Sequence, residues 1–357
     1  MARLGNKLSR ADDVLDVVTP PVTGNEVGND KAVEVTLNRN ANLYFSSVIV
    51  EGEVHIETRA IGAILTIGEH CILALDESMP SAIEFSGSAN ASINCGIASN
   101  SSDDWSIHVG GTASLTADPA QAYGDIYVEG SAELITNNPP QPYAPRVVDP
   151  FGPLARDLGM PASLATDTCV PSPDLSGPPG PFPPLNPDYY CGTLLIENKI
   201  TSLNPGTYII EDGDFRIKAG SIVTGTGVTI ILTGTTPELV GTIEFTSDST
   251  VQLTAPTTGP YKGVLIYIDQ SAESFDSEGN MIKNLVLGGA NTTFEGAIYA
   301  ASREIVYTGG SATGSHCLRI VARKVTFFGN TVINNDPGAC AALGLDPIDQ
   351  IRIRLAG

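Results

Sequence analysis

Basic residues are scarce in this sequence. Its 357 residues include 19 Lys and Arg against 40 Asp and Glu, which gives a formal net charge of −21 at pH 7. Proteins that bind nucleic acid present basic surfaces to the phosphates, and electrostatic binding to anionic lipid also depends on clustered Lys and Arg. The charge therefore argues against both partners. We interpret it as a solubility feature of a protein outside the cell, with cation binding as the alternative.

Long apolar runs are also missing. No stretch approaches the roughly 18 consecutive apolar residues that a membrane-spanning helix needs, so we expect no membrane span in this chain. Residues 1–13 carry basic groups but lack the apolar segment of a signal peptide. Because the composition is typical of an exported protein, we expect either a fragment that lost an N-terminal anchor or export signals elsewhere.

Recognisable catalytic and metal motifs are absent as well. The sequence has no Cys-x-x-Cys or His-x-x-x-His pattern, which argues against zinc. It has no Gly-x-Ser-x-Gly turn between a strand and a helix, and no glycine loop that would hold a phosphate before a helix. We therefore predict no catalytic residue, no cofactor and no metal.

Six cysteines are present, and their spacing is regular. Taken in order, Cys71 and Cys95, Cys169 and Cys191, and Cys317 and Cys340 are separated by 24, 22 and 23 positions. The simplest pairing is three sequential disulfides, although six cysteines allow other connectivities. Disulfides persist in oxidising compartments, so this pairing predicts an exported protein, whereas six buried free thiols would indicate a cytosolic one.

A short phrase recurs along the chain: a glycine, small polar residues, and then alternating apolar residues. It begins at Gly87, Gly111 and Gly130, which are 24 and 19 positions apart. Looser copies begin at Ser247, Gly289 and Gly329. Repeats of about 20 residues are typical of units that bury their apolar faces only by stacking on one another.

The strand pattern predicts an all-β fold: a right-handed parallel β-helix (a solenoid) preceded by a small antiparallel β-meander. A β-sandwich is the alternative, but the strands are short and hairpin signals are sparse. The predicted segments are a flexible lead or truncated end (1–31), the meander (32–70), a first β-helix block (71–136), a proline-rich crossover (137–190), a second block (191–333) and a C-terminal cap (334–357). Within the cap, Ile351–Leu355 alternates apolar residues with arginine and predicts an edge strand.

The crossover contains 15 of the 25 prolines. Such a density is incompatible with sheet ladders, so we expect a rigid connection held by Cys169–Cys191, with a ligand of SH3-like modules as the alternative. Residues 154–164 are the one place in it where a short helix could form.

Candidate functional side chains are scattered. The cluster that comes closest to the acidic site of a carbohydrate-active enzyme is Glu211, Asp212 and Asp214 with Arg216. Similar acidic loops contain Asp103, Asp104, Asp269, Glu273 and Asp276. We expect solvated turn acids rather than the paired carboxylates of a glycosidase. The four histidines, His55, His70, His108 and His316, are dispersed and predict no ligand pair. The single tryptophan, Trp105, is either a ligand-stacking residue or a partly buried loop anchor.

Several phrases together resemble TadG-like proteins over about residues 32–333. They are Ala32–Leu37, Leu43–Ser47, Val54–Ala60, Cys71–Asp76, Ser86–Ala89, Asn94–Gly96, Asp149–Phe151, Tyr190–Gly192, Leu203–Tyr208, Leu253–Pro256, Gly259–Gly263, Gly296–Tyr299 and Tyr307–Gly310. The resemblance implies a role in assembling tight-adherence (Flp-type) pili of bacteria. Members usually begin with a transmembrane helix and an alanine-rich segment, which this chain lacks, so a membrane anchor is expected only for a full-length form. The family brings no catalytic residues.

Together these features predict a non-enzymatic structural or adhesive component of the bacterial envelope, periplasmic or extracellular. The expected partners are pilus or envelope assembly proteins, with a surface carbohydrate as a further candidate. A carbohydrate-active β-helix enzyme (polysaccharide lyase or glycoside hydrolase) and a lectin-like carbohydrate-binding module are the alternatives.

Overall fold

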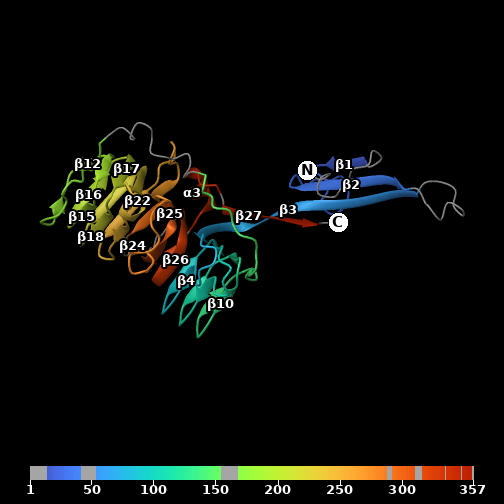
Figure 1. The fold of residues 1–357 in the computed structure, drawn as a ribbon, viewed down its shortest axis with the longest axis horizontal. Helices are drawn as coiled ribbons and strands as arrows, with labels where there is room; N and C mark the ends of the chain where they lie inside the picture. Colours follow the sequence, from blue (N-terminus) through green and yellow to red (C-terminus); the bar gives the residue numbers. More distant parts are fainter. Residues whose placement is uncertain are drawn as a thin grey trace. The chain divides into compact units, whose positions relative to one another are not determined.

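The computed structural model of the protein (Figure 1) describes residues 14–41, 54–153, 168–287, 292–309, 316–333, 335–346 and 348–355. The chain forms two compact units, residues 1–67 with 349–357 and residues 68–348. Residues 42–53 of the predicted meander and the possible helix at 154–164 lie outside the described residues.

The first unit holds an antiparallel sheet, as the alternation predicted, and the described residues give it three strands. Strand β2 (Ala32–Ala41) pairs with β1 (Val14–Val18) on one side and with β3 (Val54–Ala74) on the other. Residues 14–18 of the segment predicted to be a flexible lead or truncated end (1–31) instead form β1, which supplies the third strand. Buried Glu34 accepts hydrogen bonds from Thr23 Oγ1 and Arg59 Nε, each at 2.5 Å. These bonds lower the pKa of Glu34 to about 2.

The second unit is a parallel β-helix, which confirms the predicted fold. Its strands stack with parallel pairing on three faces, and one strand from each face makes a turn that we call a rung. The first face runs β12 (Val170–Pro171), β14 (Tyr189–Cys191), β17 (Gly206–Glu211), β20 (Val228–Thr233), β23 (Val264–Ile268), β25 (Thr293–Gly309), β26 (Leu318–Ile333), β3, β6 (Gly96–Ser99) and β9 (Ala120–Ala122).

The other two faces follow the same order. The second runs β15 (Leu194–Glu197), β18 (Phe215–Lys218), β21 (Ile243–Phe245), β24 (Lys283–Leu287), β25, β26, β4 (Ile83–Phe85), β7 (Ile107–Val109) and β10 (Ile126–Val128). The third runs β13 (Gly180–Pro181), β16 (Lys199–Leu203), β19 (Ile222–Thr226), β22 (Thr250–Thr254), β25, β26, β5 (Asn90–Ile93), β8 (Ser114–Thr116) and β11 (Glu133–Ile135).

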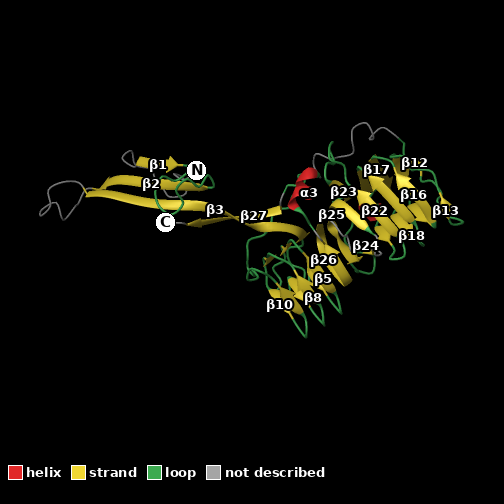
Figure 2. Ribbon diagram, turned by 180° about the vertical axis from the view of Figure 1, so that it is seen from behind, coloured by secondary structure: helices red, strands yellow, loops and turns green. Residues whose placement is uncertain are grey.

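The two blocks stack in the reverse of their order in the sequence. Strand β26, the last of the second block, pairs with β3, β4 and β5, the first of the first block. The helix therefore begins at β12 and ends at β9, β10 and β11, and Figures 1 and 2 show β12 and β10 at opposite ends of this unit. The predicted C-terminal cap is therefore wrong. Residues beyond Ile333 do not cover the end of the stack, because the first block continues the stack there. They form helix α3 (Pro337–Ala342) and strand β27 (Ile348–Leu355), which contains the predicted strand.

Glycines shape the corners at which the repeated phrase begins. Gly87, Gly111 and Gly130 all have φ between 70° and 75°, a left-handed conformation that L side chains rarely adopt. A Cβ on Gly111 would lie 2.7 Å from the carbonyl oxygen of Gly87, and one on Gly130 would lie 2.9 Å from that of Gly111. The repeated phrase therefore marks corners of the helix that stack tightly on one another in a column.

The proline-rich crossover follows the outside of the first face back along the helix. Near the last rung, Gln121 Nε2 donates to Pro145 O at 2.9 Å. One rung back, Asn100 exchanges two bonds of 2.8 Å with the backbone of Val147. Further back, Tyr299 Oη donates to Asp149 Oδ2 at 2.8 Å. The crossover therefore covers an apolar outer surface that includes Tyr299.

Proline does join the ladders at one place, contrary to the prediction. Pro171 in β12 and Pro181 in β13 belong to the first rung, and each of these strands is only two residues long. Among the described residues each pairs on one side alone. A proline is tolerated there because an edge strand leaves half of its backbone groups unpaired.

Candidate functional site at the terminal rung

All six cysteines are bonded in the predicted order, Cys71–Cys95, Cys169–Cys191 and Cys317–Cys340. The second disulfide joins the first rung to the next, and the third ties α3 to the start of β26. Three disulfides are typical of proteins outside the cytoplasm. None of the described helices is long and apolar enough to cross a membrane.

The acidic cluster at 211–216 holds turns together. Asp212 accepts from Thr235 N at 2.7 Å, and Asp214 accepts from Thr242 N at 2.7 Å and from Arg216 at 2.5 Å. Glu211 accepts from the Tyr189 hydroxyl, and burial with this bond raises the pKa of Tyr189 to about 12. These carboxylates thus have separate partners on neighbouring rungs.

The other acidic loops serve their own turns. Asp269 accepts from Ser271 N at 2.9 Å, and Asp276 accepts from Asn280 N at 2.8 Å, a bond that lowers the pKa of Asp276. Within the parts of the chain that the structure describes, no three His, Cys, Asp or Glu side chains gather as metal ligands would.

The histidines are dispersed, as expected. His70 is buried, with Nδ1 3.1 Å from Ile348 O, and His316 Nδ1 lies 2.7 Å from Glu295 Oε1. His55 lies in the antiparallel sheet of the other unit. His108 differs from these because it lies beside exposed aromatic rings.

The exposed rings of Trp105 and Tyr127 and the half-buried ring of His108 form one group, here called the aromatic group. Trp105 stacks on Tyr127 with ring centroids 4.7 Å apart and planes 5° apart, and the ring of His108 lies 5.1 Å from that of Trp105. Trp105 is 41% exposed and Tyr127 is 37% exposed. Asp103 holds the loop by accepting from Trp105 N at 2.8 Å. Of the two roles considered for Trp105, this exposure favours ligand stacking.

The aromatic group reaches into the last rung, β9, β10 and β11, which we call the terminal rung, because Tyr127 belongs to β10. Inward positions that are fully covered one rung earlier are open here. Val109 is 0% exposed, whereas Val128, its partner in the parallel register, is 40% exposed. Leu115 is likewise buried, while its partner Leu134 is only partly so. The apolar core therefore ends in solvent at this rung.

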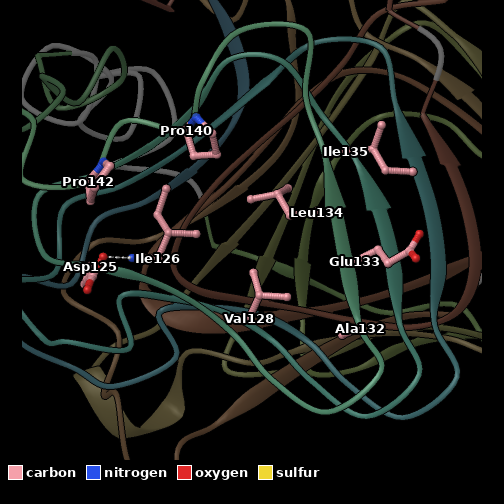
Figure 3. A pocket seen from close by; sticks show the side chains of 9 residues that line it. All are labelled: Asp125, Ile126, Val128, Ala132, Glu133, Leu134, Ile135, Pro140 and Pro142. Carbon is pink, nitrogen blue, oxygen red and sulfur yellow. Dashed lines mark hydrogen bonds between the residues drawn. The ribbon is translucent and has the colours of Figure 1, made fainter.

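An open cavity of about 590 Å³ marks this end of the core. Its lining consists of Asp125, Ile126, Val128, Ala132, Glu133, Leu134, Ile135, Pro140 and Pro142. Figure 3 shows Ile126, Val128 and Leu134 around one space, with Pro140 and Pro142 beside it. The lining is mostly apolar, and two carboxylates lie among it.

Two of the three strand edges at the terminal rung have no partner strand among the residues that the structure describes. In the described part of the chain, β10 pairs only with β7, and β11 pairs only with β8. The outer edge of β9 is instead covered, because Ala122 N donates to Gln141 O at 3.0 Å and Ala144 N donates to Ala122 O at 2.9 Å. Open edges are templates for pairing with another chain.

The electrostatic setting is strongly acidic. Residues 60–145 contain no Lys or Arg, and they contain ten acidic residues: Glu69, Asp76, Glu77, Glu84, Asp103, Asp104, Asp118, Asp125, Glu129 and Glu133. Asp125, Glu129 and Glu133 belong to the terminal rung, and Asp125 raises the pKa of the nearby Tyr143 hydroxyl. Sequence reasoning missed this site, although the long stretch without basic residues was a signal for it.

Exposed large apolar side chains concentrate here. Among the described residues of the second unit, thirteen such side chains are exposed, and six of them fall between residues 105 and 143: Trp105, Tyr123, Tyr127, Val128, Ile135 and Tyr143. Contiguous exposed apolar surface usually marks an interaction site. The terminal rung and the aromatic group beside it are therefore the candidate site.

Comparison with known proteins adds no relative. The chain matches no protein-family model, no curated protein and no solved structure.

Proposed function

We propose that this protein is a non-enzymatic structural or adhesive component of the bacterial envelope, periplasmic or extracellular, that works with tight-adherence pilus assembly. The observation that carries the proposal is the exposed apolar surface at one end of an otherwise filled β-helix. Such a surface suits contact with another macromolecule. The disulfides support the compartment, and the resemblance of residues 32–333 to TadG-like proteins supports the pilus system.

The test uses the full-length gene in a bacterium that builds such pili. Tagged protein is recovered from envelope fractions after mild crosslinking, and the co-purifying proteins are identified. We expect pilin or pilus assembly proteins, and we expect deletion of the gene to reduce surface adhesion until the gene is restored. Unchanged adhesion, together with recovery of no pilus protein, would refute the proposal.

A second candidate function is carbohydrate binding at the aromatic group. Trp105 lies flat on Tyr127 and remains 41% exposed, so it offers an apolar surface on which a sugar ring can stack. His108, with Nε2 3.1 Å from Glu129 Oε1, places polar atoms beside it. A carbohydrate-active enzyme has weaker support, because the acidic clusters described above hold turns.

Trp105 is the single tryptophan, so its fluorescence reports on the aromatic group directly. Purified protein is titrated with envelope polysaccharides and their oligosaccharides. Carbohydrate binding predicts a saturable change in emission that Tyr127→Ala weakens and that Tyr261→Phe, at a buried position in the turn before β23, leaves unchanged. An emission that no glycan alters would exclude this candidate for the glycans tested.

A further inference from the structure

We propose that the terminal rung binds an extended segment of a partner protein, which adds to β10 and β11 as the next rung of the helix. The segment is apolar at alternate positions and carries Lys or Arg between them. This inference rests on the proposed structural role, because it names the contact through which that role is carried out.

The inward side chains define what the segment must offer. Along the second face, Ile83, Ile107 and Ile126 follow one another in register, and Val109 precedes Val128. Each rung covers the apolar side chains of the previous one, and nothing among the described residues does so for Val128. A strand with inward apolar side chains would bury this surface as the earlier rungs do.

The backbone defines the geometry of the contact. Among the described residues, no strand pairs with the outer edges of β10 and β11, whereas residues 141–144 cover β9. A partner segment can therefore pair along two faces, opposite residues 126–135, which requires about ten residues: two short extended stretches joined by a corner that contains glycine, as at Gly130. Pairing through main-chain hydrogen bonds, with side chains read at alternate positions, is the established mode of strand addition.

Charge selects the occupant. Asp125 and Glu133 line the opening, and residues 60–145 supply no basic side chain. Two copies of this rung placed end to end would bring like carboxylates together, which disfavours a second copy. The opposite end of the helix is also a poor partner, because its two-residue strands contain Pro171 and Pro181. A basic segment of a different protein satisfies these conditions.

The experiment measures binding of fluorescent ten-residue peptides to the purified, oxidised chain by anisotropy. The probe has Val and Arg at alternate positions of two short stretches, with Gly at the corner between them. One control replaces Arg with Glu, and a second keeps the side chains but carries N-methyl groups at alternate amides, which removes hydrogen bonds. We expect the probe to bind at least about tenfold more tightly than either control, because charge and ladder bonds both contribute.

The protein variants locate the site. Val128→Lys should weaken binding by about tenfold or more, since it places a cation in the apolar opening. Val148→Lys is the matched control, because Val148 is 83% exposed on the crossover, and it should bind as the wild type does. Glu133→Gln should lower the affinity and flatten its dependence on salt. Circular dichroism and the unfolding midpoint establish whether each variant is folded. If Val128→Lys does not fold, Glu133→Gln, at an exposed position, tests the site in its place.

Several outcomes would overturn the inference: equal binding of the three peptides, equal affinity of the two lysine variants, or a wild-type dimer in sedimentation that Val128→Lys dissociates. The last result would identify a second copy as the occupant. If the peptide fails to bind while the envelope pull-down still recovers pilus proteins, the strand acceptor is wrong and the proposed function stands. If the peptide binds and no pilus protein is recovered, the proposed function fails instead.

Discussion

The reversed stacking of the two blocks rests on a pair of rings that can be tested directly. Phe85 of β4 and Phe327 of β26 stack with centroids 4.5 Å apart and planes 2° apart, and both side chains are fully buried. These residues lie 242 positions apart in the sequence, since 327 − 85 = 242. They meet only if the second block precedes the first along the helix. The test is a double-mutant cycle of Phe85→Leu and Phe327→Leu.

The structure sets the size of the expected coupling. Each single change should lower the free energy of unfolding by about 1–2 kcal/mol, less than the roughly 3–5 kcal/mol of a buried Phe→Ala. A stacked aromatic pair contributes about 0.5–1.5 kcal/mol beyond its buried area. The double variant should therefore lose less stability than the sum of the single variants, by about that amount.

Urea unfolding of the four oxidised proteins gives the coupling energy. The matched control pairs Phe85→Leu with Phe215→Leu, because Phe215 is also fully buried but contacts the ring of Phe245, in the second block. Distant sites should be additive within about 0.3–0.5 kcal/mol. A Phe85–Phe327 cycle as additive as this control would refute the described stacking.

Three further predictions concern single features. Gly111→Ala should lower the free energy of unfolding by about 1–3 kcal/mol in thermal unfolding, because it places an Ala in a left-handed conformation against the Gly87 carbonyl. Gly28→Ala, at a similar positive φ but with open space around it, should lower the free energy of unfolding by less. Glu34, with a pKa lowered to about 2, should stabilise the antiparallel sheet above about pH 4.5 and lose that contribution as the pH falls toward 2; Glu34→Gln should remove this pH dependence in hydrogen exchange of β2 amides. Replacing both Cys169 and Cys191 with Ser should cost about 2–5 kcal/mol in urea unfolding and loosen the first rung.

The sequence was informative wherever structure depends on local pattern. Gly87, Gly111 and Gly130 marked corners because a left-handed turn needs glycine wherever it recurs. The meander strand Ala32–Ala41 followed from its alternation of apolar and polar residues. The sequential disulfides were the simplest pairing because consecutive rungs place residues about 20 positions apart side by side.

The sequence was silent wherever structure depends on which repeats meet. All repeats look alike, so no local pattern indicates that β26 stacks on β3 rather than ending the helix. For the same reason the terminal rung could not be recognised, because Val128 has the same character as Val109 and differs only in lacking a successor. The strand β1 was missed because five residues between polar neighbours form a strand only when β2 provides an edge.

The reversed order also explains why the terminal rung is open. A helix that ended at the end of a chain could be closed by whatever followed it. Here the chain leaves the terminal rung at Pro139 and Pro140 and must travel back to the first rung, at the other end of the helix. On its way it pairs with β9 through residues 141–144 and then follows the first face, where Val147 and Asp149 are held. The departing segment can thus cover one edge only, and β10 and β11 stay available for a partner.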